Sequence, residues 1–290
     1  MKLNNLNKVV VPIAGLGTRM LPATKAIPKE MLPIVTKPII QYIVEEIIEA
    51  GFKEIIFITH SSKSSVENHF DQSFELETVL EKRVKRGLLK EIKSISNLKT
   101  SIHTIRQGHA LGLGHAILCA KPIIQNEPFA VVLPDMLIKN SDKQNDLFEL
   151  KKAFEISGKS QILVGKVQKK DISNYGIVKI NNLNIESIIE KPSINKAPSN
   201  LFVIGRYIFE NSFFAYLQKN KTSNKTGEFE LSSAIQNFIE ASNEVMCKKL
   251  MGNYYDCGDK LGYLKAIVDY ALQDEEYGKD FKNYIKKITR

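Results

Sequence analysis

Cysteine is scarce in this chain, and its scarcity excludes two kinds of stabilising site. Cys119, Cys247 and Cys257 lie far apart, are odd in number and form no CxxC pair. Neither a disulfide framework nor a structural zinc site is therefore expected. This cysteine usage fits a reducing cytoplasm.

Long apolar runs are also missing. No run approaches the length of a membrane span, and the apolar residues 9–13 are too few for the core of a signal peptide. No internal repeat, low-complexity tract or Gly/Ser linker divides the 290 residues. We therefore expect a soluble cytoplasmic protein, not associated with a membrane, that forms a single domain over residues 1–290.

Acidic residues are too few to balance the basic ones. Lys and Arg total 41 against 32 Asp and Glu, so the net charge is +9, and the excess must face solvent or an anionic ligand. It is densest over residues 82–106, where we expect a solvated helix face. By charge alone, nucleic acid, anionic lipid and small polyphosphates are all possible partners. Nucleic acid is not expected, because aromatic residues are not interleaved with the basic ones and no binding module is recognisable.

A strand–helix–strand unit opens the chain. Residues 9–13 and 54–58 are short apolar runs typical of buried strands, apolar residues recur at helical spacing over 39–48, and Gly51 ends that helix. Strands joined by such a crossover are parallel, and their carboxyl ends lie at one edge of the sheet, where ligand loops collect.

The alternation of elements continues to the end of the chain, which predicts an α/β fold with an elaborated C-terminal half. The further strands expected are 102–106, 129–133, 161–167, 177–180, 187–189, 201–209 and 245–250, and the further helices are 65–70, 75–89, 114–120, 213–218, 231–241 and 262–272. Asp135 follows one of these strands at the ligand edge, where a metal or a substrate could reach it. The alternative is an ordinary turn or capping aspartate.

A glycine loop follows the first strand. It fails the Walker pattern, because Thr18 stands at the lysine position, and the dinucleotide pattern, because Met20 stands at the third glycine. Gly15 and Gly17 still allow backbone N–H groups to approach phosphate oxygens.

Two cations strengthen the interpretation of this loop as an anion site. Arg19 offers a planar fork for two phosphate oxygens, and Lys29 adds a mobile point charge. Prolines on either side of Lys29 hold the segment in a fixed path, because each proline ring fixes φ. A glycine turn with unrelated surface cations is the alternative.

Three further motifs carry polar side chains near predicted strand ends. Gln107 offers both a donor and an acceptor for a nucleobase edge, and Gly112 permits close approach of a base or, alternatively, tight packing. Glu190 and Lys191 could take sugar hydroxyls and a sugar phosphate, although such a turn is more often solvated surface. Asp256 lies at another turn.

These motifs resemble those of the bacterial UTP–glucose-1-phosphate uridylyltransferases, in order and nearly end to end. The matching segments are AGLGTRMLP (14–22), PKEMLP (28–33), KPIIQY (37–42), GLGHA (112–116), LPD (133–135), EKP (190–192), APSNL (197–201), GRY (205–207) and YDCG (255–258). The resemblance implies a sugar nucleotidyltransferase with a Rossmann-like mixed, mostly parallel sheet flanked by helices. It further implies Mg²⁺-dependent reaction of UTP with glucose 1-phosphate, a nucleotide-binding half at about 1–140, a sugar-binding half at about 141–290, and a homo-oligomer of two or four chains.

The resemblance also assigns roles, position by position. It gives nucleotide contacts to Ala14, Gly15, Gly17, Thr18, Gln107 and Gly112, and sugar contacts to Gly176, Glu190, Lys191 and Val203. The catalytic residues it implies are Arg19 and Lys29, which clamp the triphosphate, and Lys191, which binds the sugar phosphate. It gives Mg²⁺ to Asp135 and Asp256.

Departures from the family pattern leave alternatives open. Ser233 stands where the family usually has Asp, Leu111 where relatives often have Lys, and Phe202 where many have Ala. A thymidylyl sibling is one alternative, but such relatives lack the insert at 66–98 and typically carry threonine at the position of Cys257. A catalytically silent regulatory homologue is another, although a protein that only binds has no need of a metal pair.

Overall fold

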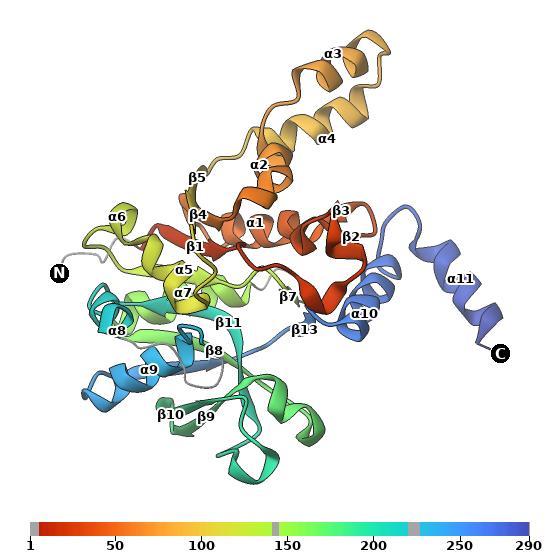
Figure 1. Cartoon of the computed structure of the whole chain (residues 1–290). Coiled ribbons are helices and arrows are strands. Elements are labelled where there is room, and N and C mark those ends of the chain that lie inside the picture. The colour runs from red at the N-terminus through yellow and green to blue at the C-terminus, as the bar shows by residue number, and fades with distance from the viewer. Residues whose placement is uncertain (1–5, 141–144, 220–226, 290) are drawn as a thin grey trace.

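A nine-stranded mixed sheet forms the centre of the computed structural model, which describes residues 6–140, 145–219 and 227–289 (Figure 1). The strands are β1 (Lys8–Pro12), β2 (Pro33–Ile34), β3 (Lys37–Pro38), β4 (Glu54–Thr59), β5 (Ser101–Arg106), β6 (Phe129–Val132), β7 (Met136–Lys139), β8 (Ser160–Lys166), β9 (Gly176–Asn181), β10 (Asn184–Glu190), β11 (Leu201–Phe209), β12 (Val245–Lys249) and β13 (Asn253–Asp256). The helices are α1 (Ile39–Glu49), α2 (Ser64–Phe70), α3 (Phe74–Lys82), α4 (Arg86–Ser96), α5 (Leu113–Cys119), α6 (Lys121–Ile124), α7 (Asp146–Ser157), α8 (Phe213–Lys219), α9 (Leu231–Glu240), α10 (Lys260–Ala271) and α11 (Gly278–Ile288).

The order of strands in the main sheet is β5-β4-β1-β6-β11-β8-β12-β10-β9, and β9 also pairs with β11. Strands β5, β4, β1 and β6 are mutually parallel, and so are β8 and β12. Only β10 and β11 of these nine run in the opposite direction. The prediction of a mixed, mostly parallel sheet is therefore confirmed.

Helices cover both faces of this sheet, which makes three layers. Along β1, the buried side chains of Val9 and Val11 join the core under α1, α7 and α10, and Val10 joins the core under α5, α6, α8 and α9. Strands buried on both faces have no polar side to alternate with, which is why the sequence shows them as continuous apolar runs.

The predicted helix over 75–89 is wrong in its extent. The chain turns back at Val84, whose φ of 56° is left-handed, and forms the antiparallel pair α3 and α4 instead. This pair projects from the body as an arm (Figure 1). No side chain of α4 is buried, in agreement with the solvated basic face expected there.

Several elements were not predicted. The helix α7 is capped at its start by Asn145, whose side chain accepts a hydrogen bond from the Phe148 N–H, and at its end by Gly158 in the left-handed conformation. The helix α11 and the two-stranded β7–β13 sheet were also missed, as was α4 beyond residue 89. Within the described ranges, no helix is long and apolar enough to cross a membrane.

Candidate active site

The loop after β1 is compact and brings its two predicted clamp residues together. Gly17 has a φ of 68°, and a Cβ on it would lie 3.2 Å from the Cβ of Lys29. The hydroxyl of Thr24 donates to the Gly17 carbonyl at 2.7 Å. Gly17 therefore both allows the turn and lets the segment carrying Lys29 pack against the segment carrying Arg19.

Asp135 follows β6 at the carboxyl edge of the sheet, as predicted. Its Oδ2 lies 2.7 Å from the ammonium of Lys29 and 3.7 Å from the Nη2 of Arg19. Burial alone would raise the pKa of Asp135, but the charges of Lys29 and Arg19 outweigh it and hold this pKa below its usual value. Burial likewise favours neutral Lys29, yet Asp135 raises the pKa of Lys29 above its usual value, so both groups are charged.

Asp256 reaches the same place from the end of β13. It lies opposite Met136 in the β7–β13 pairing, and Met136 directly follows Asp135. Its carboxylate accepts hydrogen bonds from the Tyr175 hydroxyl at 3.2 Å and from the Gly258 N–H at 2.9 Å. Burial and the neighbouring charge of Asp135 raise the pKa of Asp256. The two carboxylates therefore repel each other.

Gly258 shows how small the space between these groups is. A Cβ on this residue would lie 2.6 Å from the Nη2 of Arg19, 2.9 Å from the Oδ2 of Asp135 and 3.0 Å from the Oδ1 of Asp256. The two carboxylates thus flank one point, with an arginine beside it. Any side chain at position 258 would displace at least one of the three.

The two carboxylates fit a magnesium ion whose coordination shell is completed by phosphate oxygens of the substrate. Mg²⁺ is usually bound by one or two carboxylates together with phosphate oxygens and water. Asp135 and Asp256 supply two such carboxylates. Among the described residues, no group of three or more His, Cys, Asp or Glu side chains is arranged to hold a metal without a substrate.

The residues predicted for the sugar also lie together. A Cβ on Gly176 would lie 3.2 Å from the Oε2 of Glu190 and 3.3 Å from the Cγ2 of Val203. Burial raises the pKa of Glu190, although the charge of Lys191 opposes the rise. Lys191 has a left-handed φ of 43°, and its N–H donates to the Tyr175 carbonyl at 3.1 Å. This uncommon conformation for lysine marks the turn as a site of local strain.

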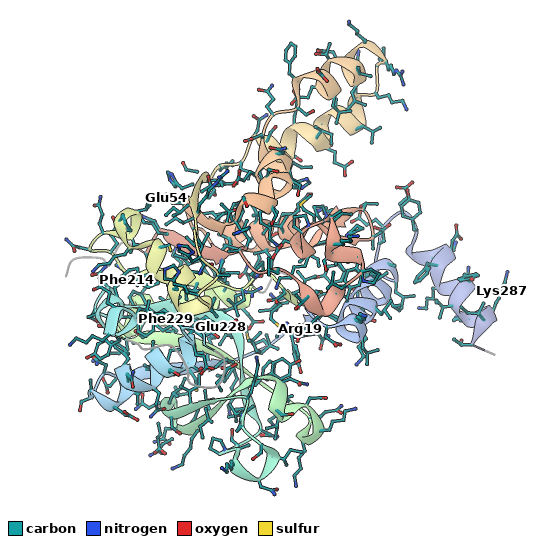
Figure 2. The ribbon with its side chains drawn as sticks, viewed as in Figure 1. Arg19, Glu54, Phe214, Glu228, Phe229 and Lys287 are labelled. Carbon is teal, nitrogen blue, oxygen red and sulfur yellow. The ribbon has the colours of Figure 1, made fainter. Side chains whose placement is uncertain are left out.

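One cavity of about 680 Å³ joins Asp135 and Asp256 to the residues predicted for the sugar. Of the predicted site residues, its lining contains Arg19, Asp135, Gly176, Glu190, Lys191, Val203 and Asp256. Arg19 and Glu228, both on the lining, lie near the middle of the molecule in Figure 2, whereas Lys287 on α11 lies at its edge. Cations and carboxylates from both halves of the chain therefore converge on one space.

The other predicted residues lie outside that lining, although all of them are described: Ala14, Gly15, Gly17, Thr18, Lys29, Gln107 and Gly112. Gly15 borders open space, since a Cβ there would meet no atom within 4 Å. The amide of Gln107 donates to the Gly112 carbonyl at 3.2 Å. The nucleotide roles of these residues stay predictions.

The glycines of the segment GLGHA (112–116) pack against protein. A Cβ on Gly112 would lie 2.8 Å from the Cβ of Glu228 and 2.9 Å from the Phe229 nitrogen. The N–H of Gly114 donates to the Phe229 carbonyl at 2.8 Å. Tight packing, the alternative given for these glycines, is therefore what the structure shows on this side of the loop.

Sequence reasoning missed some residues of the site and left others open. Tyr175 was missed because no motif surrounds it. Burial and the charge of Asp256 raise the pKa of its hydroxyl, so the hydroxyl stays protonated and can donate a hydrogen bond. Ser232, not Ser233, lines the cavity, and the Ser233 hydroxyl lies 3.4 Å from Glu230. Phe202 packs on Tyr175 with ring centroids 4.7 Å apart.

Comparisons with known proteins show which family the chain belongs to. The family model described as "Nucleotidyl transferase" matches residues 8–273. A UTP–glucose-1-phosphate uridylyltransferase from Haemophilus influenzae is 49% identical, over 98% of this chain and 99% of the relative.

Solved structures of UDP-glucose pyrophosphorylases are also similar to this chain. A UDP-glucose pyrophosphorylase from Acinetobacter baumannii superposes with a TM-score of 0.90 at 43% identity, covering 98% of this chain and 99% of that one. A UTP-bound UGPase from the same organism gives 0.88 at 43% identity, covering 97% and 98%. The chain therefore belongs to the nucleotidyl transferase family, in the branch of the UTP–glucose-1-phosphate uridylyltransferases.

Proposed function

We propose that this chain transfers the uridylyl group of UTP to glucose 1-phosphate, giving UDP-glucose and pyrophosphate. The observation that carries this proposal is the single cavity in which Arg19, Asp135 and Asp256 meet Glu190 and Lys191. The side of the cavity with Asp135 and Asp256 suits a triphosphate, and the side with Glu190 and Lys191 suits a phosphorylated sugar. The names of the relatives, one of them UTP-bound, support the same substrates.

The reaction needs little acid–base chemistry. A phosphate oxygen of glucose 1-phosphate is already a nucleophile at neutral pH, so no general base has to activate it. That oxygen bonds to the α-phosphorus in line, the bond from the α-phosphorus to its bridging oxygen breaks, and pyrophosphate leaves with the electron pair. The main obstacle is the repulsion between two polyanions, which catalysis must relieve by positioning and charge.

The chain's cations are arranged to relieve that repulsion. We assign the departing pyrophosphate to Arg19 and Lys29, which share the carboxylate of Asp135 at 3.7 and 2.7 Å. We assign the phosphate of the incoming sugar to Lys191, whose side chain is 62% exposed on the cavity. A single well-placed arginine contributes about 10³- to 10⁵-fold in phosphoryl transfer.

Asp135 and Asp256 would hold Mg²⁺, which when bound neutralises charge on the reacting phosphates. Tyr175 donates to Asp256 and so orients that carboxylate, and the Gly258 N–H donates to its other oxygen. We assign the hydroxyls of glucose to Glu190, with Gly176 and Val203 shaping the wall behind it. The nucleotide contacts fall to Ala14, Gly15, Gly17, Thr18, Gln107 and Gly112.

The setting proposed for this reaction follows from the chain as a whole. We propose a single nucleotidyltransferase domain, with a nucleotide-binding half at about 1–140 and a sugar-binding half at about 141–290. The main sheet crosses both halves, which supports one domain. We also propose a cytoplasmic homo-oligomer of two or four chains that binds neither nucleic acid nor membrane.

A pyrophosphate-release assay that crosses UTP and dTTP with several sugar 1-phosphates tests the proposal. We expect release with UTP and glucose 1-phosphate, dependent on Mg²⁺, and much slower release with dTTP. A preference for dTTP would instead support the thymidylyl alternative. No release with any pair, despite binding of UDP-glucose, would support a catalytically silent sensor.

A further inference from the structure

Arg206 is the largest side chain that is fully buried in the described part of the protein. Its guanidinium makes five hydrogen bonds, which is the full donor capacity of an arginine side chain. Two of these bonds form a fork on the carboxylate of Glu46, at 2.9 and 2.6 Å. Glu46 lies on α1, and its side chain is only 11% exposed.

The other three bonds go to main-chain carbonyls around Asp135. Arg206 donates to the carbonyls of Leu133 at 3.2 Å and of Met136 at 2.8 Å, which lie on either side of Pro134 and Asp135. It also donates to the Gly205 carbonyl at 3.3 Å. One guanidinium therefore holds both ends of the turn that presents the Asp135 carboxylate.

Neighbouring hydrogen bonds connect the Asp135 turn to the second carboxylate, that of Asp256. Met136 pairs with Asp256 in the β7–β13 sheet, and the Cys257 N–H donates to the Asp135 carbonyl at 2.7 Å. The Leu133 N–H donates to the Gly205 carbonyl at 2.8 Å, where a left-handed φ of 73° brings the two strands close. A displacement of the Asp135 turn would therefore also move Asp256.

Stability alone is a weak reason for such a residue. Replacing a buried ion pair by apolar side chains is often neutral or stabilising, because desolvation of the two charges offsets their attraction. A buried arginine whose main-chain bonds all fall on and beside one ligand-bearing turn is better explained by the position of that turn. Residues that orient metal ligands in this way typically change metal affinity about 10- to 100-fold when they are replaced.

We propose that Arg206, oriented by Glu46, is a positioning residue that fixes Asp135, and through Met136 also Asp256, in the geometry that binds the divalent cation. This inference rests on the proposed function, because it takes the two aspartates as the metal pair. Arg206 itself does not line the cavity, although it donates to the carbonyls of three residues that do: Leu133, Gly205 and Met136. It acts on the reaction only through the Asp135 turn.

The test measures metal binding directly and not only turnover. Mn²⁺ is titrated onto the protein saturated with UDP-glucose and without pyrophosphate, and the loss of the free-ion EPR signal gives the bound fraction. For Arg206→Met and Arg206→Lys we expect Mn²⁺ affinity to fall about 10-fold or more. UDP-glucose affinity measured by calorimetry without metal should change by less than about 3-fold, since Arg206 contacts no substrate.

Two controls separate positioning from a general loss of stability. Ile124→Ala removes core packing on α6 at the opposite, amino-terminal end of β6, and should lower the melting temperature without changing Mn²⁺ affinity. If Arg206→Met does not fold, Arg206→Lys and Glu46→Gln decide the matter, because both keep most of the buried volume. Wild-type Mn²⁺ affinity in those two folded variants would overturn the inference.

Asp135→Asn separates this inference from the proposed function on which it rests. If Asp135→Asn binds Mn²⁺ as tightly as the wild type, the metal pair itself is misassigned. If Asp135→Asn loses Mn²⁺ while the Arg206 and Glu46 variants bind it normally, only the positioning role fails.

Discussion

Lys191 reaches the cavity from a backbone conformation that lysine rarely adopts, and its charge is the one proposed for the sugar phosphate. We predict that Lys191→Ala lowers turnover at least about 100-fold, because the incoming phosphate is then left without a neutralising partner. Steady-state UDP-glucose formation measures this effect.

Lys179 gives a matched control for that substitution. Its side chain is 59% exposed, close to the 62% of Lys191, and it pairs with Glu186 on the neighbouring strand. Lys179→Ala should leave turnover within about twofold of the wild type, because exposed ion pairs contribute little. Near wild-type turnover in Lys191→Ala would contradict the role given to this lysine.

Glu190 links the pH of the solution to sugar binding. Burial raises its pKa above the ordinary glutamate value, so it takes up a proton at a higher pH than an exposed glutamate does. A protonated Glu190 accepts sugar hydroxyls less well, so the KM for glucose 1-phosphate should rise as the pH falls through this raised pKa. A KM profile as flat for the wild type as for Glu190→Gln would contradict the assignment.

The Glu190 carboxylate also lowers the stability of the folded protein when it is ionised. Because the pKa is higher in the folded state than in the unfolded state, ionised Glu190 lowers the free energy of unfolding above both values. Glu190→Gln should therefore be more stable than the wild type at neutral pH, and the difference should disappear below the ordinary glutamate pKa. Thermal melts over a pH series measure this.

The sequence predicts a site residue when the residue's position follows from its own strand or loop, and not when it depends on a partner far away in the sequence. Asp135 was predictable, because it directly follows a buried strand whose carboxyl end must lie at the ligand edge. Tyr175 and Arg206 were not, because their partners Asp256 and Glu46 lie 81 and 160 positions away in the sequence. Contacts over such separations depend on the tertiary fold, which no short motif specifies.

At the scale of elements, a buried ion pair ties α2 to the loop that carries Lys29. Lys63, just before α2, donates to Glu30 at 2.7 Å, and the two side chains are only 3% and 1% exposed. We predict that Lys63→Met lowers the free energy of unfolding by about 3–5 kcal/mol, because it leaves a buried carboxylate without its counterion. Chemical denaturation measures the loss.

An exposed pair in the same region serves as the comparison. Lys37 lies 2.9 Å from Glu45, with both side chains more than a third exposed, so Lys37→Met should cost less than about 1 kcal/mol. The double substitution Lys63→Met with Glu30→Met should recover much of the lost stability, since it removes the unpaired charge. Equal losses for Lys63→Met and Lys37→Met would exclude this account.

The sequence predicts elements well where one periodicity persists and poorly where elements are short or their apolar pattern is interrupted. The strands β1, β4 and β6 are continuous apolar runs and were all predicted. The strands β7 and β13 were missed, because neither is a continuous apolar run and only their mutual pairing defines them. The helix α7 carried recognisable signals in Asn145 and Gly158, which an explicit search for caps would have found.

For the molecule as a whole, the C-terminal helix α11 buries little of its surface against the rest of the described chain. Of its residues only Gly278 is buried, and the helix extends away from the body in Figure 1. An isolated helix of this length is marginal in water. Phe281, Ile285 and Ile288 recur at helical spacing along it, and such a stripe gains stability when another surface covers it.

A second copy of the chain is the occupant that the proposed homo-oligomer supplies for this stripe. We predict that Ile285→Glu shifts the protein toward monomers, because a charge buried in an apolar interface has no partner. Asn283→Glu adds the same charge on the opposite side of the helix, at an exposed position, and should leave the assembly unchanged. Light scattering after size exclusion gives the masses. A wild-type protein that is monomeric at micromolar concentration, or an Ile285→Glu variant with the wild-type mass, would place the stripe outside any assembly.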